Sequence, residues 1–227
     1  MTGNKSTYDE SKIKTLSSLE HIRLRTGMYI GRLGDGLSPD DGIYILLKEI
    51  IDNSVDEFIM GAGNQIVINL QGRRMRVRDY GRGIPLGKVI ECVSVINTGA
   101  KYNDDVFQFS VGLNGVGTKA VNALSSEFRV VSYREGHAFE AKFVRGLRVD
   151  SREFETREKT GTLVEFVPDE QIFGEYTFVF EFIEKRLWSY ACLNPGLKLS
   201  INGKEFQTEK GLQELLSTEL GGRALYD

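Results

Sequence analysis

The chain has 227 residues, of which 41% are hydrophobic and 27% charged, and its formal net charge is −3. This size and composition are typical of one large or two small globular domains with a substantial core. They argue against a surface basic enough to hold duplex DNA unaided, and no apolar run reaches the ~20 residues that a membrane span needs.

Histidine and cysteine are both scarce. The chain has two of each, which excludes a metal site built from several histidines. The cysteines, Cys92 and Cys192, are isolated, and the first residues carry no signal-peptide pattern. We therefore expect reduced thiols in a cytoplasmic protein that contacts no membrane. Any acid–base chemistry should fall to a carboxylate.

Three segments are expected before the first strand. Residues 1–15 are polar and unpatterned, which predicts a flexible N-terminal arm. A short helix over 17–25 should begin at a Ser-x-x-Glu capping box and stop at Gly27. Asp40 or Asp41 should then cap a long helix that ends near residue 60.

The remaining pattern is dominated by hairpins, with turns at Gly72, Gly136 and Gly203. Because hairpins outnumber strand–helix–strand units, we expect one α/β (α+β) domain over 16–227 with a mixed or antiparallel sheet. The expected strands cover 65–71, 74–79, 128–134, 137–145, 162–167, 197–201 and 205–207. The expected helices cover 88–97 and 176–191, and a glycine-rich loop with another helix covers 112–125.

The long helix combines an apolar stripe with three polar side chains. Glu49, Asn53 and Asp56 stand at i, i+4 and i+7, within one narrow arc that borders the stripe. Two acids and an amide on one rim can orient a water and hold a hydrated hard cation such as Mg²⁺, which prefers oxygen ligands. A solvated polar face is the alternative, and for this helix alone it is the favoured one.

Asp79 ends a strand on its apolar face. Met75, Val77 and Asp79 share one face of that strand, and three arginines take the other. A carboxylate on the core side needs a partner, and the glycines that follow allow a ligand to approach closely. Such an acceptor suits a nitrogenous ring with an exocyclic amine, and an aspartate that caps the next turn is the equal alternative. Leu86 excludes a dinucleotide-binding glycine fingerprint.

Three glycines precede the helix expected within 112–125. Gly112, Gly115 and Gly117 would free backbone N–H groups to converge on an anion at the helix N-terminus. The spacing nearly matches a Walker A loop, but the next two residues are Thr-Lys, which inverts the required order. The pattern therefore predicts a phosphate cradle outside the P-loop class, with Lys101 as a candidate phosphate partner.

Together these motifs resemble the ATPase domain of the bacterial type IIA topoisomerase B subunits, in the GHKL superfamily that also contains MutL, sensor histidine kinases and heat-shock ATPase chaperones. The resemblance is near end to end. It implies ATP and Mg²⁺ as cofactors and a two-layer Bergerat-type ATPase sandwich with helices on one face of the sheet. The matching stretches are 25–31, 51–57, 79–85, 112–117, 121–125 and 159–162, of which 28–31 and 159–162 point to the topoisomerase branch.

The resemblance implies a role for each motif. Glu49 would be the general base for the attacking water, and Asn53 would bind Mg²⁺. Asp79 would accept a hydrogen bond from the adenine amino group, with Thr162 assisting through water. The implied nucleotide-binding residues are Tyr8 (which would reach the partner subunit's nucleotide), Asn53, Asp56, Asp79, Gly83, Ile84, Lys101, Gly112, Leu113, Asn114, Gly115, Val116, Gly117, Thr118 and Thr162. The rim, where aminocoumarins would compete, is Glu57, Arg82, Pro85 and Arg134.

Some positions depart from the family pattern. Ile45 lies where a histidine commonly supports the base, so other groups must tune the pKa of Glu49. Asn114 replaces the usual lid histidine, which leaves more of the phosphate binding to Lys101. Gln108 and the 51–57 stretch are more similar to topoisomerase IV than to gyrase. We expect an excised N-terminal fragment that binds ATP and hydrolyses it slowly as a monomer.

The resemblance also implies partners. ATP binding would drive homodimerisation, and this would be coupled to DNA strand passage in an A₂B₂ complex with a topoisomerase A subunit. DNA would be contacted through the full complex rather than through this domain. The alternatives are a gyrase B ATPase, another ATPase of the superfamily, and a nucleotide-sensing module without hydrolysis.

Overall fold

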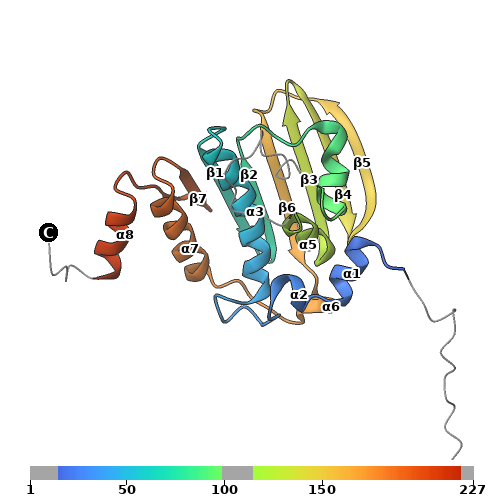
Figure 1. Cartoon of the computed structure of the whole chain (residues 1–227), viewed down its shortest axis with the longest axis horizontal. Helices are drawn as coiled ribbons and strands as arrows, with labels where there is room; N and C mark the ends of the chain where they lie inside the picture. Colours follow the sequence, from blue (N-terminus) through green and yellow to red (C-terminus); the bar gives the residue numbers. More distant parts are fainter. Residues whose placement is uncertain (1–14, 99–114, 221–227) are drawn as a thin grey trace, which may run out of the picture.

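Eight strands form a single sheet in a computed structural model that describes residues 15–98 and 115–220 (Figure 1). The strands are β1 (Gln65–Gln71), β2 (Arg74–Asp79), β3 (Ser125–Arg134), β4 (His137–Val144), β5 (Leu147–Glu155), β6 (Gly161–Pro168), β7 (Lys198–Ile201) and β8 (Lys204–Phe206). The helices are α1 (Ser18–Leu24), α2 (Gly27–Ile30), α3 (Gly42–Ile59), η2 (Leu86–Lys88), α4 (Val89–Ser94), α5 (Gly117–Ala123), α6 (Glu170–Phe173), α7 (Phe180–Leu193) and α8 (Leu212–Glu219).

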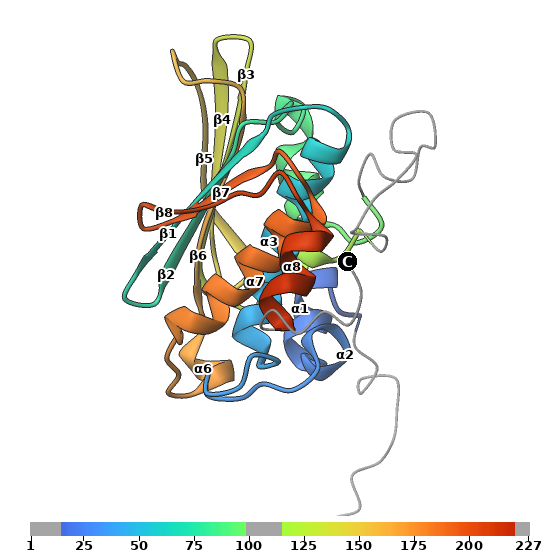
Figure 2. The same ribbon diagram turned by 90° about the vertical axis from the view of Figure 1, so that its left-hand side faces the viewer.

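The sheet is mixed, as the hairpin count predicted. Its strand order is β5-β4-β3-β6-β2-β1-β7-β8, and every neighbouring pair is antiparallel except β1 and β7. Figure 2 shows the second layer, in which α1, α3, α7 and α8 all lie on the same side of the sheet. This order makes β2 and β6 neighbours, so their ends can bring distant parts of the sequence together.

The core lies between the sheet and α3. The apolar stripe of α3 is buried as predicted, and its members Ile43, Leu46, Leu47, Ile50, Ile51 and Val55 are each at most 3% exposed. Their partners on the sheet include Val77, Val130 and Phe166, which alternate along their strands with outward-facing residues. Because α3 is anchored along this whole face, its polar rim is held in a fixed position above the end of β2. None of the described helices is both long and apolar enough to cross a membrane.

The helix starts show where local patterns work. The predicted capping box forms at α1, where the side chains of Ser17 and Glu20 each accept a hydrogen bond from the other's backbone N–H. Gly27, however, does not simply stop that helix, because it begins the one-turn helix α2. Asp41 does precede α3, but its carboxylate accepts from Gly36 and Ser38 in the preceding loop rather than from the first turn of α3.

Besides the short helices α2, η2 and α6, two elements were not predicted. Every residue of β5 except Phe154 is exposed, so the strand shows no alternation of buried and exposed residues. The helix α8 buries none of its residues against the described part of the chain. In addition, α7 begins at Phe180 rather than near 176, because buried Tyr176 and Phe178 pack in the loop before it.

Ion pairs cross the outer face of the sheet, which we define as the face turned away from α3. Arg129 donates to Glu165 at 2.6 Å and also to Glu140, and Arg152 donates to Glu140 at 2.6 Å. Arg76 lies 3.7 Å from Glu165. These pairs form a chain across β2, β6, β3, β4 and β5. The carboxylate of Glu140 within this chain is buried, because the residue is only 1% exposed.

Candidate functional site

The rim of α3 meets the start of α5. The carboxylate of Glu49 lies so close to Gly117 that a Cβ atom on Gly117 would sit 1.8 Å from Oε2 of Glu49. Gly117 is the first residue of α5, and negative charge is favoured beside a helix N-terminus. Because Gly117 has no side chain, the Glu49 carboxylate can occupy the space next to it. Glu49 is thus half-buried at the junction of the two helices.

Asn53 continues the same rim one turn further along. Its amide nitrogen donates to the carbonyl of Glu49 at 2.7 Å and to the hydroxyl of Thr118 at 2.9 Å. Both N–H donors then have protein acceptors, which fixes the orientation of the amide oxygen. An amide oxygen fixed next to a carboxylate suits Mg²⁺, which takes few protein ligands and keeps several waters. Asp56, expected on the same arc, is 1% exposed.

Asp79 is buried at the end of β2. Its Oδ1 atom accepts from the N–H of Gly81 at 2.9 Å and from the N–H of Thr162 at 3.1 Å. The bond to Gly81 is the turn cap that was one of the two interpretations. Both bonds end on Oδ1, so Oδ2 is not used by either. Burial raises the pKa of Asp79 to about 6, although the N–H groups of Gly81 and Thr162 oppose the shift.

The segment after Asp79 is held by α3 and β3. Glu57 accepts three hydrogen bonds from Arg82, one from its backbone N–H at 2.9 Å and two from its guanidinium at 3.0 and 2.9 Å. The hydroxyl of Ser132 donates to the carbonyl of Ile84 at 2.6 Å, and Arg134 donates to the carbonyl of Gly83 at 3.2 Å. The structure thus brings the predicted rim residues Glu57, Arg82 and Arg134 together, with Pro85 exposed beside them.

Thr162 contributes its backbone to the site. The first residues of β6 lie beside the end of β2, and the Thr162 N–H meets Asp79 directly. Gly115, Val116, Gly117 and Thr118 are half-buried at the start of α5. Five further predicted residues fall outside the described residues: Tyr8, Lys101, Gly112, Leu113 and Asn114.

Sequence reasoning missed two buried cations. Lys119, set aside as part of a failed Walker A match, is 4% exposed and donates to the carbonyl of Thr98 at 2.6 Å, which ties α5 to the segment after α4. Arg78, assigned with two other arginines to the outer face, is 6% exposed and donates to the carbonyls of Asp79 and Lys159. No local pattern distinguishes these residues from solvated ones. Among the described residues, no group of three or more His, Cys, Asp or Glu could hold a metal.

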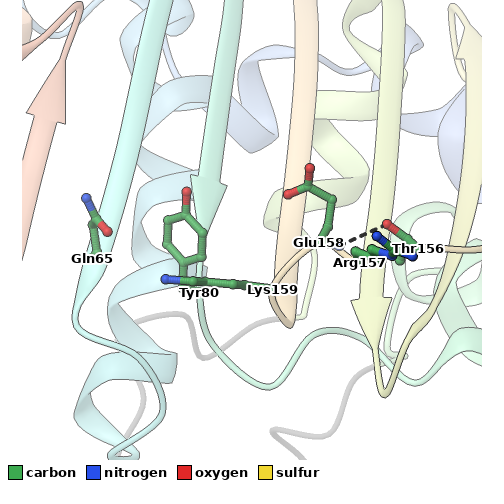
Figure 3. A pocket seen from close by; sticks show the side chains of 6 residues that line it. All are labelled: Gln65, Tyr80, Thr156, Arg157, Glu158 and Lys159. Atoms are coloured by element: carbon green, nitrogen blue, oxygen red, sulfur yellow. Dashed lines mark hydrogen bonds between the residues drawn. The ribbon is translucent and has the colours of Figure 1, made fainter.

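A pocket of about 370 Å³ opens at the same end of the sheet, between the start of β1, the end of β2 and the β5–β6 loop (Figure 3). It is lined by Gln65, Tyr80, Thr156, Arg157, Glu158 and Lys159. None of these six residues belongs to the predicted site. The pocket therefore lies next to the residues that hold Asp79 and does not contain Asp79 itself.

Comparisons with known proteins bear on this arrangement. A family model described as histidine kinase-, DNA gyrase B-, and HSP90-like ATPase matches residues 39–172. The B subunit of DNA topoisomerase 4 from Borreliella burgdorferi is 63% identical over 97% of this chain and 37% of that protein. The B subunit of DNA gyrase from Halalkalibacterium halodurans is 37% identical over 93% of this chain and 35% of that protein. The chain thus spans about a third of the length of these relatives.

One solved structure is also similar. It is the crystal structure of the 43K ATPase domain of Thermus thermophilus gyrase B in complex with an aminocoumarin, with a TM-score of 0.76 and 33% sequence identity. The match covers 93% of this chain and 57% of that one. The similarity therefore extends through both the sheet and the helix layer.

Proposed function

We propose, from the premise that the chain belongs to the histidine kinase-, DNA gyrase B- and HSP90-like ATPase family, that it is the ATP-binding and hydrolysing module of the B subunit in a type IIA DNA topoisomerase. The observation that carries the proposal is that one helix, α3, fixes both the segment after the proposed adenine acceptor and the proposed water-activating acid. Glu57 of α3 holds the segment that follows Asp79, and Glu49 of the same helix meets α5.

Asp79 suits the adenine ring. A buried carboxylate whose Oδ1 is occupied by two backbone donors can offer Oδ2 to an exocyclic amine. The glycine at position 83 has a positive φ of 70°, and a Cβ atom there would lie 2.8 Å from the carbonyl of Tyr133. The backbone after Asp79 is therefore packed tightly against β3, which gives the ring a fixed wall.

Glu49 suits the chemistry of hydrolysis. We assign it the role of general base, which accepts a proton from the water that attacks the terminal phosphate. Asn53 would hold Mg²⁺, which when bound neutralises charge that develops on the phosphates. The start of α5 would receive the phosphates with its backbone N–H groups, because Gly115 to Thr118 precede or begin the helix there.

The wider function follows from the relatives. We propose ATP-gated homodimerisation that drives DNA strand passage together with an A subunit in an A₂B₂ complex, in the cytoplasm where chromosomal DNA lies. The 63% identity to a topoisomerase 4 protein, against 37% to a gyrase protein, favours relaxation and decatenation over supercoiling. We also propose that aminocoumarins bind at Glu57, Arg82, Pro85 and Arg134, because the similar Thermus structure holds one.

Glu49→Ala tests the proposal. Binding of a non-hydrolysable ATP analogue should survive, whereas ATP hydrolysis and ATP-dependent decatenation should disappear in the full-length protein assembled with its A subunit. Glu181→Ala is the matched control, because Glu181 is an exposed acid on α7. Hydrolysis that persists in Glu49→Ala removes Glu49 as the base. An unmutated chain that binds no ATP analogue refutes the proposed function itself.

A further inference from the structure

Arg78 is buried where its strand predicts exposure. It lies on the outer face of β2 with Arg74 and Arg76, whose side chains remain 44% and 50% exposed. Arg78 as a whole is only 6% exposed. Among the described residues, no carboxylate forms an ion pair with it. A buried guanidinium without an ion-pair partner is costly unless other groups solvate it, so its contacts should reveal what it does.

Those contacts bind two segments together. One guanidinium nitrogen donates to the carbonyl of Asp79 and the other to the carbonyl of Lys159, in the loop before β6. The guanidinium also lies over two aromatic rings, 4.6 Å from the ring centre of Tyr80 and 4.5 Å from that of Tyr133. Carbonyl dipoles and ring faces therefore replace water around the charge.

Gly161 makes this bridge possible. Its φ is +138°, and a Cβ atom there would lie 2.2 Å from the carbonyl oxygen of Asp79 and 2.4 Å from Nη1 of Arg78. Only glycine leaves room for the guanidinium to reach the strand end at this point. The next residue, Thr162, donates its N–H to the Asp79 carboxylate, so Arg78 and Asp79 hold the same two strand ends from opposite faces of the sheet.

We propose that Arg78 is a positioning residue for nucleotide recognition, which fixes the backbone that carries Asp79 against the start of β6. The proposal rests on the proposed function, because it takes Asp79 as the adenine acceptor. Arg78 acts through the backbone and does not touch the nucleotide.

Charge gives the proposal a measurable signature. The charged groups that act on Asp79 are Arg78, which lowers its pKa, and Glu57 of α3, which raises it; Glu57 is in turn paired with Arg82. The element β6 contributes only the Thr162 N–H. Removing the Arg78 charge should therefore raise the pKa of Asp79. Because the protonated carboxyl binds the amine less well, affinity should then begin to fall at a higher pH.

The experiment compares affinities for a non-hydrolysable ATP analogue between pH 5.5 and 8.5. The ratio of variant to wild-type affinity at each pH cancels the ionisation of the phosphates. Arg78→Met should lose affinity at every pH, and the loss should be larger at pH 5.5 than at pH 8.5 by about 2.5-fold, which corresponds to a rise of ~0.5 unit in the Asp79 pKa from about 6. Arg78→Lys keeps the charge but cannot bridge both carbonyls, so its loss should not vary with pH.

Arg76→Met is the matched control, because Arg76 lies two residues earlier on the same face and contacts Glu165 instead. It should reproduce the wild-type profile. Wild-type affinity at every pH in Arg78→Met, or in Arg78→Lys if the methionine variant does not fold, overturns the proposal. Asp79→Asn separates a failure of the adenine assignment from a failure of the Arg78 role alone. If this variant leaves both the affinity and its pH profile unchanged, the adenine assignment fails, and the role of Arg78 fails with it.

Discussion

The carboxylate of Glu49 occupies the space that a side chain at Gly117 would need. A Cβ atom on Gly117 would lie 1.8 Å from Oε2 and 2.8 Å from Cδ of Glu49. Atoms that are not bonded cannot approach so closely, and the far end of a glutamate is the part that can move. The start of α5 therefore sets the position of the proposed base.

Gly117→Ala should displace Glu49 without unfolding the domain. We expect ATP hydrolysis to fall by about tenfold or more, because a misplaced base loses much of its contribution. The free energy of unfolding should change by less than ~1 kcal/mol, since alanine is a better helix former than glycine. Gly87→Ala is the control, because nothing lies within 4 Å of a Cβ atom there. Equal hydrolysis by both variants would contradict this arrangement.

Thr118 should matter through Asn53. Thr118→Val removes the acceptor of the Asn53 amide nitrogen while keeping the shape of the side chain, so the amide oxygen loses its fixed orientation. We expect a higher Mg²⁺ concentration for half-maximal ATP hydrolysis, by about three- to tenfold, from the loss of one hydrogen bond. Thr118→Ser keeps the hydroxyl and should behave as wild type. A Mg²⁺ requirement that does not change in Thr118→Val would count against Asn53 as the metal ligand.

Asp79 should couple stability to pH. Its folded-state pKa of about 6 lies above the ordinary value of 3.8, so the folded state binds the proton more tightly. Its contribution to stability is therefore full below pH 3.8 and is lost as the pH rises through 6, by about 3 kcal/mol for two pKa units.

Asp79→Asn should remove this dependence. Between pH 5 and pH 8 its free energy of unfolding should rise relative to that of the wild type, which loses stability over this range. Denaturant titration at each pH measures both values. The same variant should bind the ATP analogue more weakly by ~1–3 kcal/mol, the cost of mispairing one buried polar group. Parallel stability curves for the two proteins would show that burial does not raise the pKa of Asp79.

Glu140 allows stability to be separated from binding. Hydrogen bonds from Arg129 and Arg152 outweigh its burial and hold its pKa below the usual value, so its contribution is present at neutral pH and is lost as the pH falls through that lowered value. Glu140→Gln should cost about 1–3 kcal/mol of unfolding free energy and leave nucleotide affinity unchanged. Asp150→Asn, at a half-exposed pair with Lys142, should cost less than ~1 kcal/mol. Weaker nucleotide binding in Glu140→Gln would mean that the ion pairs around Glu140 influence the site.

Periodic patterns predicted most of the fold. The stripe of α3 was predicted because the helix buries one face. The β1–β2, β3–β4 and β7–β8 hairpins were predicted because each has a turn with a glycine. The strand β5 was missed for a physical reason. It is an edge strand with almost no buried side chain, and its pairing with β4 depends on backbone hydrogen bonds that no residue pattern records.

Candidate site residues could be selected where a residue type is itself the signal. Glu49, Asn53 and Asp79 were singled out because acids and amides on an apolar face or rim need a partner, and the resemblance to the ATPase family then implied their roles. Arg78 and Lys119 were not found, because their burial depends on Tyr133 and Thr98, which lie far away in the sequence. Only the folded chain brings those partners together.

The helix α3 carries Glu49 and Glu57 on one rigid body. Eight residues separate them, which is about 12 Å along a helix. The proposed adenine-binding end and the proposed hydrolytic end of the site therefore cannot move independently. A compound that binds Glu57 and displaces α3 would also displace Glu49. A resistance substitution at residue 57 would therefore have to preserve the position of α3 to keep ATP hydrolysis. Mutational escape from such compounds should accordingly be confined to side chains that leave α3 in place.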